Sequence, residues 1–179
     1  MWSNLKLIYQ QNKEGFRFIL KMIATYAILS AIYEWVLSPY TSIDSGLIHI
    51  IIAQSEWILS GLGYELMNNP SQTQHLMGIQ GSSGVIIGGP CDGLSLFILY
   101  ATFILSFKGL WWMKGLSIAV GVIIIHSLNV LRVTALALIV VYAPDQLDFH
   151  HSYTFTLFVY GIVFLLWIWR IKIYKWIKK

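Results

Sequence analysis

The sequence predicts an all-α, polytopic membrane helix bundle that forms a single domain over residues 1–179. Hydrophobic residues make up 57% of the chain and charged residues only 11%, and the mean hydropathy is +0.67. Because a soluble domain usually carries about 25% charged residues, this composition excludes an ordinary soluble protein. Long apolar stretches alternate with short polar segments, which is the pattern of helices that cross a bilayer.

The distribution of basic residues predicts the orientation of the chain in the membrane. Residues 22–107 contain no Lys or Arg, although five acidic residues fall there: Glu34, Asp44, Glu56, Glu65 and Asp92. By the positive-inside rule, the loops of this stretch face away from the cytoplasm and both termini face it. The net charge of +4 therefore reflects topology, and no nucleic-acid partner is predicted.

At least four transmembrane helices are expected, near residues 17–37, 93–107, 114–142 and 152–170. The first ends at EWVLSPY without a small-residue cleavage site, so we expect it to be an uncleaved span. The second is short, and Asp92 is its expected N-cap. The turn SFKGLWWMKG, which joins the second and third spans, combines lysines and tryptophans as at a membrane interface.

Two segments between the first and second spans need separate interpretations. Residues 46–64 are apolar but interrupted by His49, Gln54 and Glu56. They predict an interfacial or re-entrant helix, or a crossing paired with another one, since a single crossing here would contradict the charge rule. Residues 68–90 are polar and glycine-rich, and predict an external loop with a hairpin that lies over the membrane.

The one cysteine, Cys91, lies in the run GGPCDGLSLF, where the loop becomes an apolar helix. A single cysteine cannot form an internal disulfide. The unpaired N–H groups and the positive end of the helix dipole favour its thiolate, which is the attacking form of a cysteine. Cys91 is therefore a candidate nucleophile, and the alternative is an inert buried thiol.

Polar residues of the third span predict a second part of the same site. Arg132 lies 18 residues after Lys114, a rise of about 27 Å, which places it at the outer boundary of a ~30 Å hydrocarbon core. Asn129 is one helical turn earlier on the same face, and His126 one turn before that. Residues 133–142 must then continue beyond the boundary, tilt or fold back. The alternative for Arg132 is a structural arginine at the interface.

His150 and His151 immediately precede the last span and follow Asp148, so they are expected at the same outer depth as Cys91 and Arg132. Adjacent helical residues point about 100° apart, so at most one histidine faces a site. We expect His150 to face it, with Asp148 positioning the ring. The alternative is that both histidines only cap or line the last helix. No metal and no cofactor are predicted, because no HExxH, phosphate-loop or haem-ligand spacing occurs.

These residues resemble the exosortase and archaeosortase family of multispanning cysteine transpeptidases. The resemblance rests on Cys91, Asp92 and Gly93 at a helix start, the N-x-x-R pair Asn129 and Arg132, and a histidine before the last span. It covers a catalytic core of about residues 46–170. The short length, the PCDGL run and the double histidine look most like the compact exosortase F type of Bacteroidetes.

The resemblance implies an enzyme of the bacterial cytoplasmic (inner) membrane with its site on the outer side. Its partners would be secreted proteins with a C-terminal sorting signal, made of a motif, a transmembrane helix and a basic tail. It would cut at the motif and transfer the protein to an amine or to a lipid- or glycan-linked acceptor.

In that chemistry Cys91 would attack the scissile carbonyl and Arg132 would hold the oxyanion or the substrate backbone. His150 or His151 would be the general acid and base, with Asn129, Asp92 and Asp148 in supporting roles. Two other classes remain open. A small-solute transporter would use the same polar groups as a pathway without needing the thiol, and a non-catalytic assembly subunit would tolerate loss of each group.

Overall fold

The computed structural model of the protein describes residues 12–67, 75–88 and 91–177. Over these residues it confirms the all-α membrane bundle, since three helical segments are long and apolar enough to cross a membrane: residues 13–40, 111–142 and 144–176. The terminal cations Lys6, Lys178 and Lys179, part of the predicted external loop (68–74) and Pro90 lie outside the described residues.

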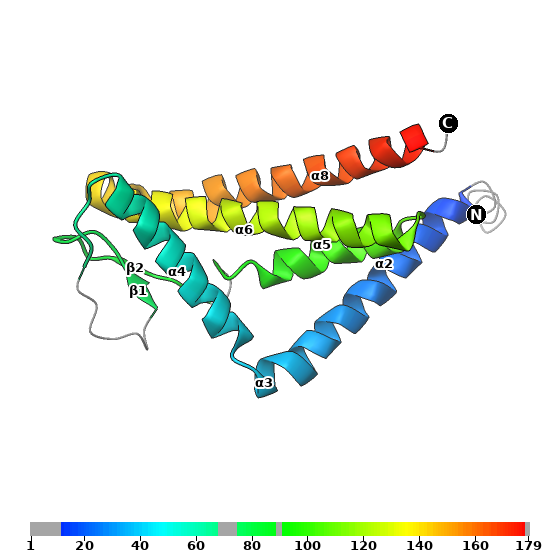
Figure 1. The fold of residues 1–179 in the computed structure, drawn as a ribbon, viewed down its shortest axis with the longest axis horizontal. Coiled ribbons are helices and arrows are strands. Elements are labelled where there is room, and N and C mark those ends of the chain that lie inside the picture. The colour runs from blue at the N-terminus through cyan, green and yellow to red at the C-terminus, as the bar shows by residue number, and fades with distance from the viewer. Residues whose placement is uncertain (1–11, 68–74, 89–90, 178–179) are drawn as a thin grey trace, which may run out of the picture.

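The first predicted span forms α2, Lys13–Ile32, which continues through a π-helical turn, η1 (Tyr33–Leu37), into the short helix α3 (Ser38–Tyr40). No residue of α2 is buried inside the protein. Its large apolar side chains are exposed, as expected of a helix that faces lipid. Where α2 packs, it packs on α5, and Figure 1 shows its far end leaving the bundle toward α3.

Residues 46–64, for which the sequence left several interpretations open, fall mostly in one helix, α4 (Ile43–Gly61). This helix packs on the second half of α6, and it forms a V with α2 in Figure 1. Its buried face consists of Ile48, Ile51, Ser55 and Leu59. The Ser55 hydroxyl donates to the carbonyl oxygen of Val130 at 3.2 Å. α4 is not among the described segments that are long and apolar enough to cross a membrane.

A two-stranded hairpin follows α4, as the sequence predicts. β1 (Leu76–Met77) pairs antiparallel with β2 (Val85–Ile86), with Leu76 opposite Ile86. Met77, Ile79 and Ile87 are buried in a core cluster that also contains Cys91 and residues of α4 and α6. The described part of the loop, residues 75–88, is therefore packed on the helices in the same cluster as Cys91.

The helix α5, Leu94–Ser106, has 13 residues and rises about 20 Å, so it is shorter than the hydrocarbon core. Its partner α6, Trp111–Tyr142, is one unbroken helix of 32 residues, about 48 Å long. Residues 133–142 therefore continue the third helix beyond Arg132 and do not fold back. α5 lies along the first half of α6, and α4 along the second (Figure 1).

The last span is preceded by a short 3-10 helix, η4 (Pro144–Gln146), the helix α7 (Leu147–Phe149) and a π-helical turn, η5 (His150–Thr154). It then forms α8, Phe155–Ile177, which runs back along α6 and α5. A second core cluster joins α5, α6 and α8 through buried residues such as Tyr100, Ile125 and Val163.

The contact between α5 and α6 predicts the effect of a glycine substitution. A Cβ on Gly121 would overlap the ring of Tyr100, which is 1% exposed and donates to the Ser117 carbonyl at 3.1 Å. Gly121→Ala should therefore destabilise the detergent-solubilised protein by about 1–3 kcal/mol. Gly115→Ala is the matched control, because a Cβ there meets nothing, and it should be neutral or slightly stabilising. Equal thermal midpoints of the two variants would contradict this packing.

Candidate active site

The structure brings the thiol of Cys91 against the ring of His151. The sulfur Sγ lies 3.5 Å from Nε2 of His151, within the range of a hydrogen bond to sulfur. Cys91 is held in a tight turn before α5, where its N–H donates to the carbonyl of Gly88 at 2.9 Å, and it is only 8% exposed. This is the separation at which an imidazole can activate a cysteine thiol as a nucleophile.

The expectation that His150 faces Cys91 was wrong. The Nε2 atom of His150 lies 3.2 Å from the side-chain oxygen of Gln146, and Nδ1 lies 3.1 Å from the hydroxyl of Thr154. Both partners are four residues away, so His150 bonds along its own helix. Because adjacent helical residues point about 100° apart, only one of the two histidines can face α5 and α6.

Asp148 acts on the His151 ring through its charge and not through a hydrogen bond. Its side chain is exposed, and among the described residues it forms no hydrogen bond with His150 or His151. The π-helical turn is instead fixed through a backbone carbonyl. The oxygen of His151 accepts from Nη2 of Arg132 and from the Thr156 hydroxyl, each at 3.4 Å. Arg132 therefore links α6 to the turn that presents His151.

Arg132 and His151 also line one pocket of about 500 Å³ between the start of α5, α6 and the start of α8. Gly93, Ser95, Thr156 and Tyr160 contribute to its walls. The Nε atom of Arg132 is buried and has no hydrogen-bond partner among the described residues. An always-charged group with a free donor therefore stands beside the histidine that contacts the thiol.

Asn129 packs directly on the backbone that follows Cys91. Gly93 has φ +83°, a left-handed conformation, and a Cβ on it would overlap Nδ2 of Asn129. Glycine is therefore required here for two reasons. Asn129 is 1% exposed, and neither atom of its amide has a hydrogen-bond partner within the described parts of the chain. Such an unpaired buried amide is costly to folding and leaves a donor and an acceptor free.

Asp92 supports the start of α5 in a different way from the predicted N-cap. The helix begins at Leu94 with Gly93 in the N-cap position, and Oδ1 of Asp92 accepts from the Leu94 N–H at 2.7 Å. Asp92 is 4% exposed. Burial raises the pKa of Asp92 to about 6, the hydrogen bond from Leu94 opposes the rise, and the nearby carboxyl of Asp44 adds to it.

Two residues near the site were not predicted from the sequence. Asp44, in the first turn of α4, accepts a hydrogen bond from the Tyr33 hydroxyl at 2.6 Å and lies beside Asp92. The sequence feature that could have identified Asp44 is an acidic residue at the start of an apolar helix. Thr156 had no such signal, because the π-helical turn changes which residues share a face with His151.

These features define an integral membrane protein with a cysteine–histidine pair and an always-charged arginine inside its helix bundle. The family described as Transmembrane exosortase (Exosortase_EpsH) matches residues 13–168. The chain therefore belongs to the transmembrane exosortase family, whose members are membrane-embedded sorting transpeptidases. No curated protein and no solved structure matches the chain.

The raised pKa of Asp92 predicts a pH-dependent stability. Between its ordinary pKa of 3.8 and about 6, the folded state binds more protons at this carboxyl than the unfolded state. Asp92 therefore makes the protein less stable as pH rises through this window. Asp92→Asn keeps an oxygen for Leu94 but does not titrate. The thermal midpoint of Asp92→Asn minus that of the unmodified protein should increase from pH 4 to pH 7. A difference that does not change with pH would contradict the raised pKa of Asp92.

Proposed function

We propose that this protein is a cysteine transpeptidase that cleaves the C-terminal sorting signals of secreted proteins and transfers the proteins to an acceptor. The observation that carries the proposal is the 3.5 Å separation between Sγ of Cys91 and Nε2 of His151. Membership of the exosortase family supports the reaction class. A transporter or an assembly subunit would not need a thiol paired with an imidazole.

In the first half of the reaction, Nε2 of His151 accepts the thiol proton and the Cys91 thiolate attacks the scissile carbonyl. The imidazolium then protonates the nitrogen of the departing segment as the peptide C–N bond breaks, which leaves a thioester on Cys91. In the second half, His151 accepts a proton from the acceptor nucleophile, which attacks the thioester. The thiolate leaves and is protonated again by His151.

Arg132 and Asn129 are the groups that can stabilise the charge that develops on the carbonyl oxygen. Nε of Arg132 is unpaired and the residue lines the pocket beside His151, so its guanidinium can donate to the oxyanion or to the substrate backbone. The unpaired amide of Asn129 lies against Gly93, next to the nucleophile turn. Donors already in place need no rearrangement when charge appears.

The location of the site suits a substrate that is itself anchored in the membrane. Cys91 precedes a helix too short to cross the hydrocarbon alone, and the adjoining pocket includes residues of the lipid-crossing segment 144–176. We assign the site to the outer side of the bacterial cytoplasmic membrane and both termini to the cytoplasm, on the charge distribution. The basic tail of the substrate would then remain cytoplasmic, and an amine or a lipid- or glycan-linked group would be the acceptor.

Capture of the acyl-enzyme tests the reaction class. The purified protein, mixed with a membrane-anchored substrate and quenched in acid, should carry a substrate peptide as a thioester on Cys91 that mass spectrometry identifies. Cys91→Ala should carry none and should abolish processing in cells, with unchanged membrane level. Full processing by Cys91→Ala would exclude a cysteine transpeptidase and favour a scaffold or transport role.

The two histidines provide a matched pair of variants. His151→Ala should slow single-turnover cleavage about 10²- to 10⁴-fold, because the acid and base are lost while the backbone carbonyl that Arg132 contacts is kept. His150→Ala should stay within a few fold, since its ring bonds only Gln146 and Thr154 among the described residues. A large defect confined to His150→Ala would reverse the assignment, and normal cleavage by both would remove the histidine from the mechanism.

A further inference from the structure

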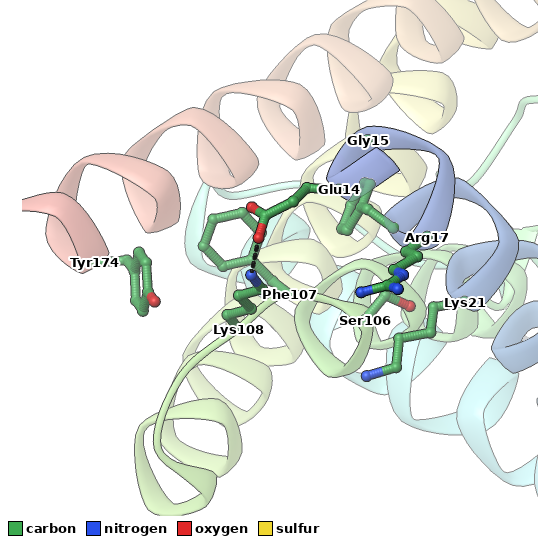
Figure 2. Close-up of a pocket in the computed structure, with 9 residues that line it drawn as sticks. Glu14, Gly15, Arg17, Lys21, Ser106, Phe107, Lys108 and Tyr174 are labelled. Atoms are coloured by element: carbon green, nitrogen blue, oxygen red, sulfur yellow. Dashed lines mark hydrogen bonds and ion pairs between the residues drawn. The ribbon is translucent and has the colours of Figure 1, made fainter. Parts of the chain in front are cut away.

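A second pocket lies at the other end of the bundle, far from Cys91. It has a volume of about 560 Å³ and opens between the first turns of α2, the turn that joins α5 to α6, and the last turns of α8. Figure 2 shows the side chains around it. None of the residues that line it belongs to the site described above, so it has no part in the proposed transpeptidation.

The pocket carries more positive than negative charge among the described residues. Arg17, Lys21 and Lys108 line it, together with one carboxylate, Glu14. Glu14 accepts from Nζ of Lys108 at 2.7 Å. Arg17 and Lys21 lie one helical turn apart on α2, and neither forms an ion pair within the described residues. Figure 2 shows both side chains extending from α2 along the wall that contains Ser106.

An unpaired hydroxyl stands in the same wall. Ser106, the last residue of α5, lines the pocket and is 6% exposed, and its Oγ has no hydrogen-bond partner among the described residues. A buried hydroxyl normally finds a partner, because leaving it unpaired costs free energy. Together with the two free cations, Ser106 completes a set of donors without an acceptor. An anion with several oxygens would satisfy them.

Aromatic rings form the remaining wall. Phe18 and Phe107 meet edge to face with centroids 6.2 Å apart, and Phe107 and Tyr174 do so at 5.3 Å. The exposed Trp111 and Trp112 follow directly on the chain, which is the arrangement of a membrane interface. A ligand for this pocket must therefore combine an anionic head with an apolar body.

We propose that this pocket binds the phosphate headgroup of an anionic membrane lipid. The phosphate oxygens accept from Arg17, Lys21 and Ser106, and the glycerol and upper acyl chains lie on the aromatic wall. Basic pockets between helices at the membrane surface bind such headgroups. The lipid would fasten the start of α2 to α5 and α8, which matters because α2 buries no residue of its own.

The test uses the full-length protein in a neutral maltoside detergent. Phosphatidylglycerol, phosphatidylcholine with the same acyl chains, or inorganic phosphate is added, and the thermal midpoint and lipid retention in native mass spectrometry are measured. Phosphatidylglycerol should raise the midpoint and remain bound, since a ligand that binds only the folded state stabilises it. Phosphatidylcholine and phosphate should have little effect.

Three variants separate a built site from general charge attraction. Arg17→Gln/Lys21→Gln should weaken phosphatidylglycerol binding about ten-fold or more, at about 1 kcal/mol per cation. Lys172→Gln/Lys175→Gln removes the same charge from exposed positions of α8 outside the pocket, and should bind normally. Ser106→Ala leaves the charge unchanged, removes an unpaired hydroxyl at little cost to folding, and should weaken binding several-fold.

Equal loss of binding in the two double variants, or normal binding by Ser106→Ala, would overturn the pocket as the site. Equal effects of phosphatidylglycerol and phosphatidylcholine would overturn the requirement for an anionic head. Stabilisation by inorganic phosphate as large as that by phosphatidylglycerol would assign the pocket to a soluble anion and overturn the lipid. None of these outcomes affects the acyl-enzyme test at Cys91.

Discussion

The contact between the Cys91–Gly93 turn and Asn129 on α6 is the constraint on which the site depends. Non-helical backbone is tolerated at membrane depth only where protein covers it. α5 begins along the middle of α6, so the turn before α5 lies deep in the molecule. Gly93 permits the close approach of this turn to α6, because it has no Cβ to meet the amide of Asn129. The Cys91–Gly93 turn is thereby held against α6.

The cover for this turn comes from α4 and the hairpin, which are not among the described segments that are long and apolar enough to cross a membrane. α4 packs along the second half of α6, and the hairpin buries Met77, Ile79 and Ile87 in the cluster that contains Cys91. These elements bury Cys91, which is 8% exposed. The π-helical turn before α8 also contacts it, and presents the His151 ring to the thiol. The sulfur therefore has a defined partner in a largely buried place.

The two ends of the bundle differ in their chemistry. At the end near Cys91, the donors that lack partners are a guanidinium nitrogen and an amide, beside a thiol and an imidazole. In the proposed reaction these donors would stabilise the charge that develops on the carbonyl oxygen. At the other end, Arg17, Lys21 and Ser106 form a set of donors for a permanent anion, beside an aromatic wall. A short α5 connects the two, and each site lies next to one of its ends.

The sequence by itself determined the membrane class, the helical segments, the short second span, the hairpin before Cys91 and the common location of Cys91, Arg132 and the histidine pair. These follow from hydropathy, charge and helix length, which are local and additive along the chain. Only the tertiary structure decided that His151 and not His150 meets the thiol, and that Asp148 forms a hydrogen bond with neither ring among the described residues. It also decided that Asp92 accepts from the first helical N–H one residue before the N-cap, and that Asp44 lies beside Asp92. Those outcomes depend on the rotation of each helix about its axis, which the π-helical turn and the packing on α6 set, and no local pattern in the chain records that rotation.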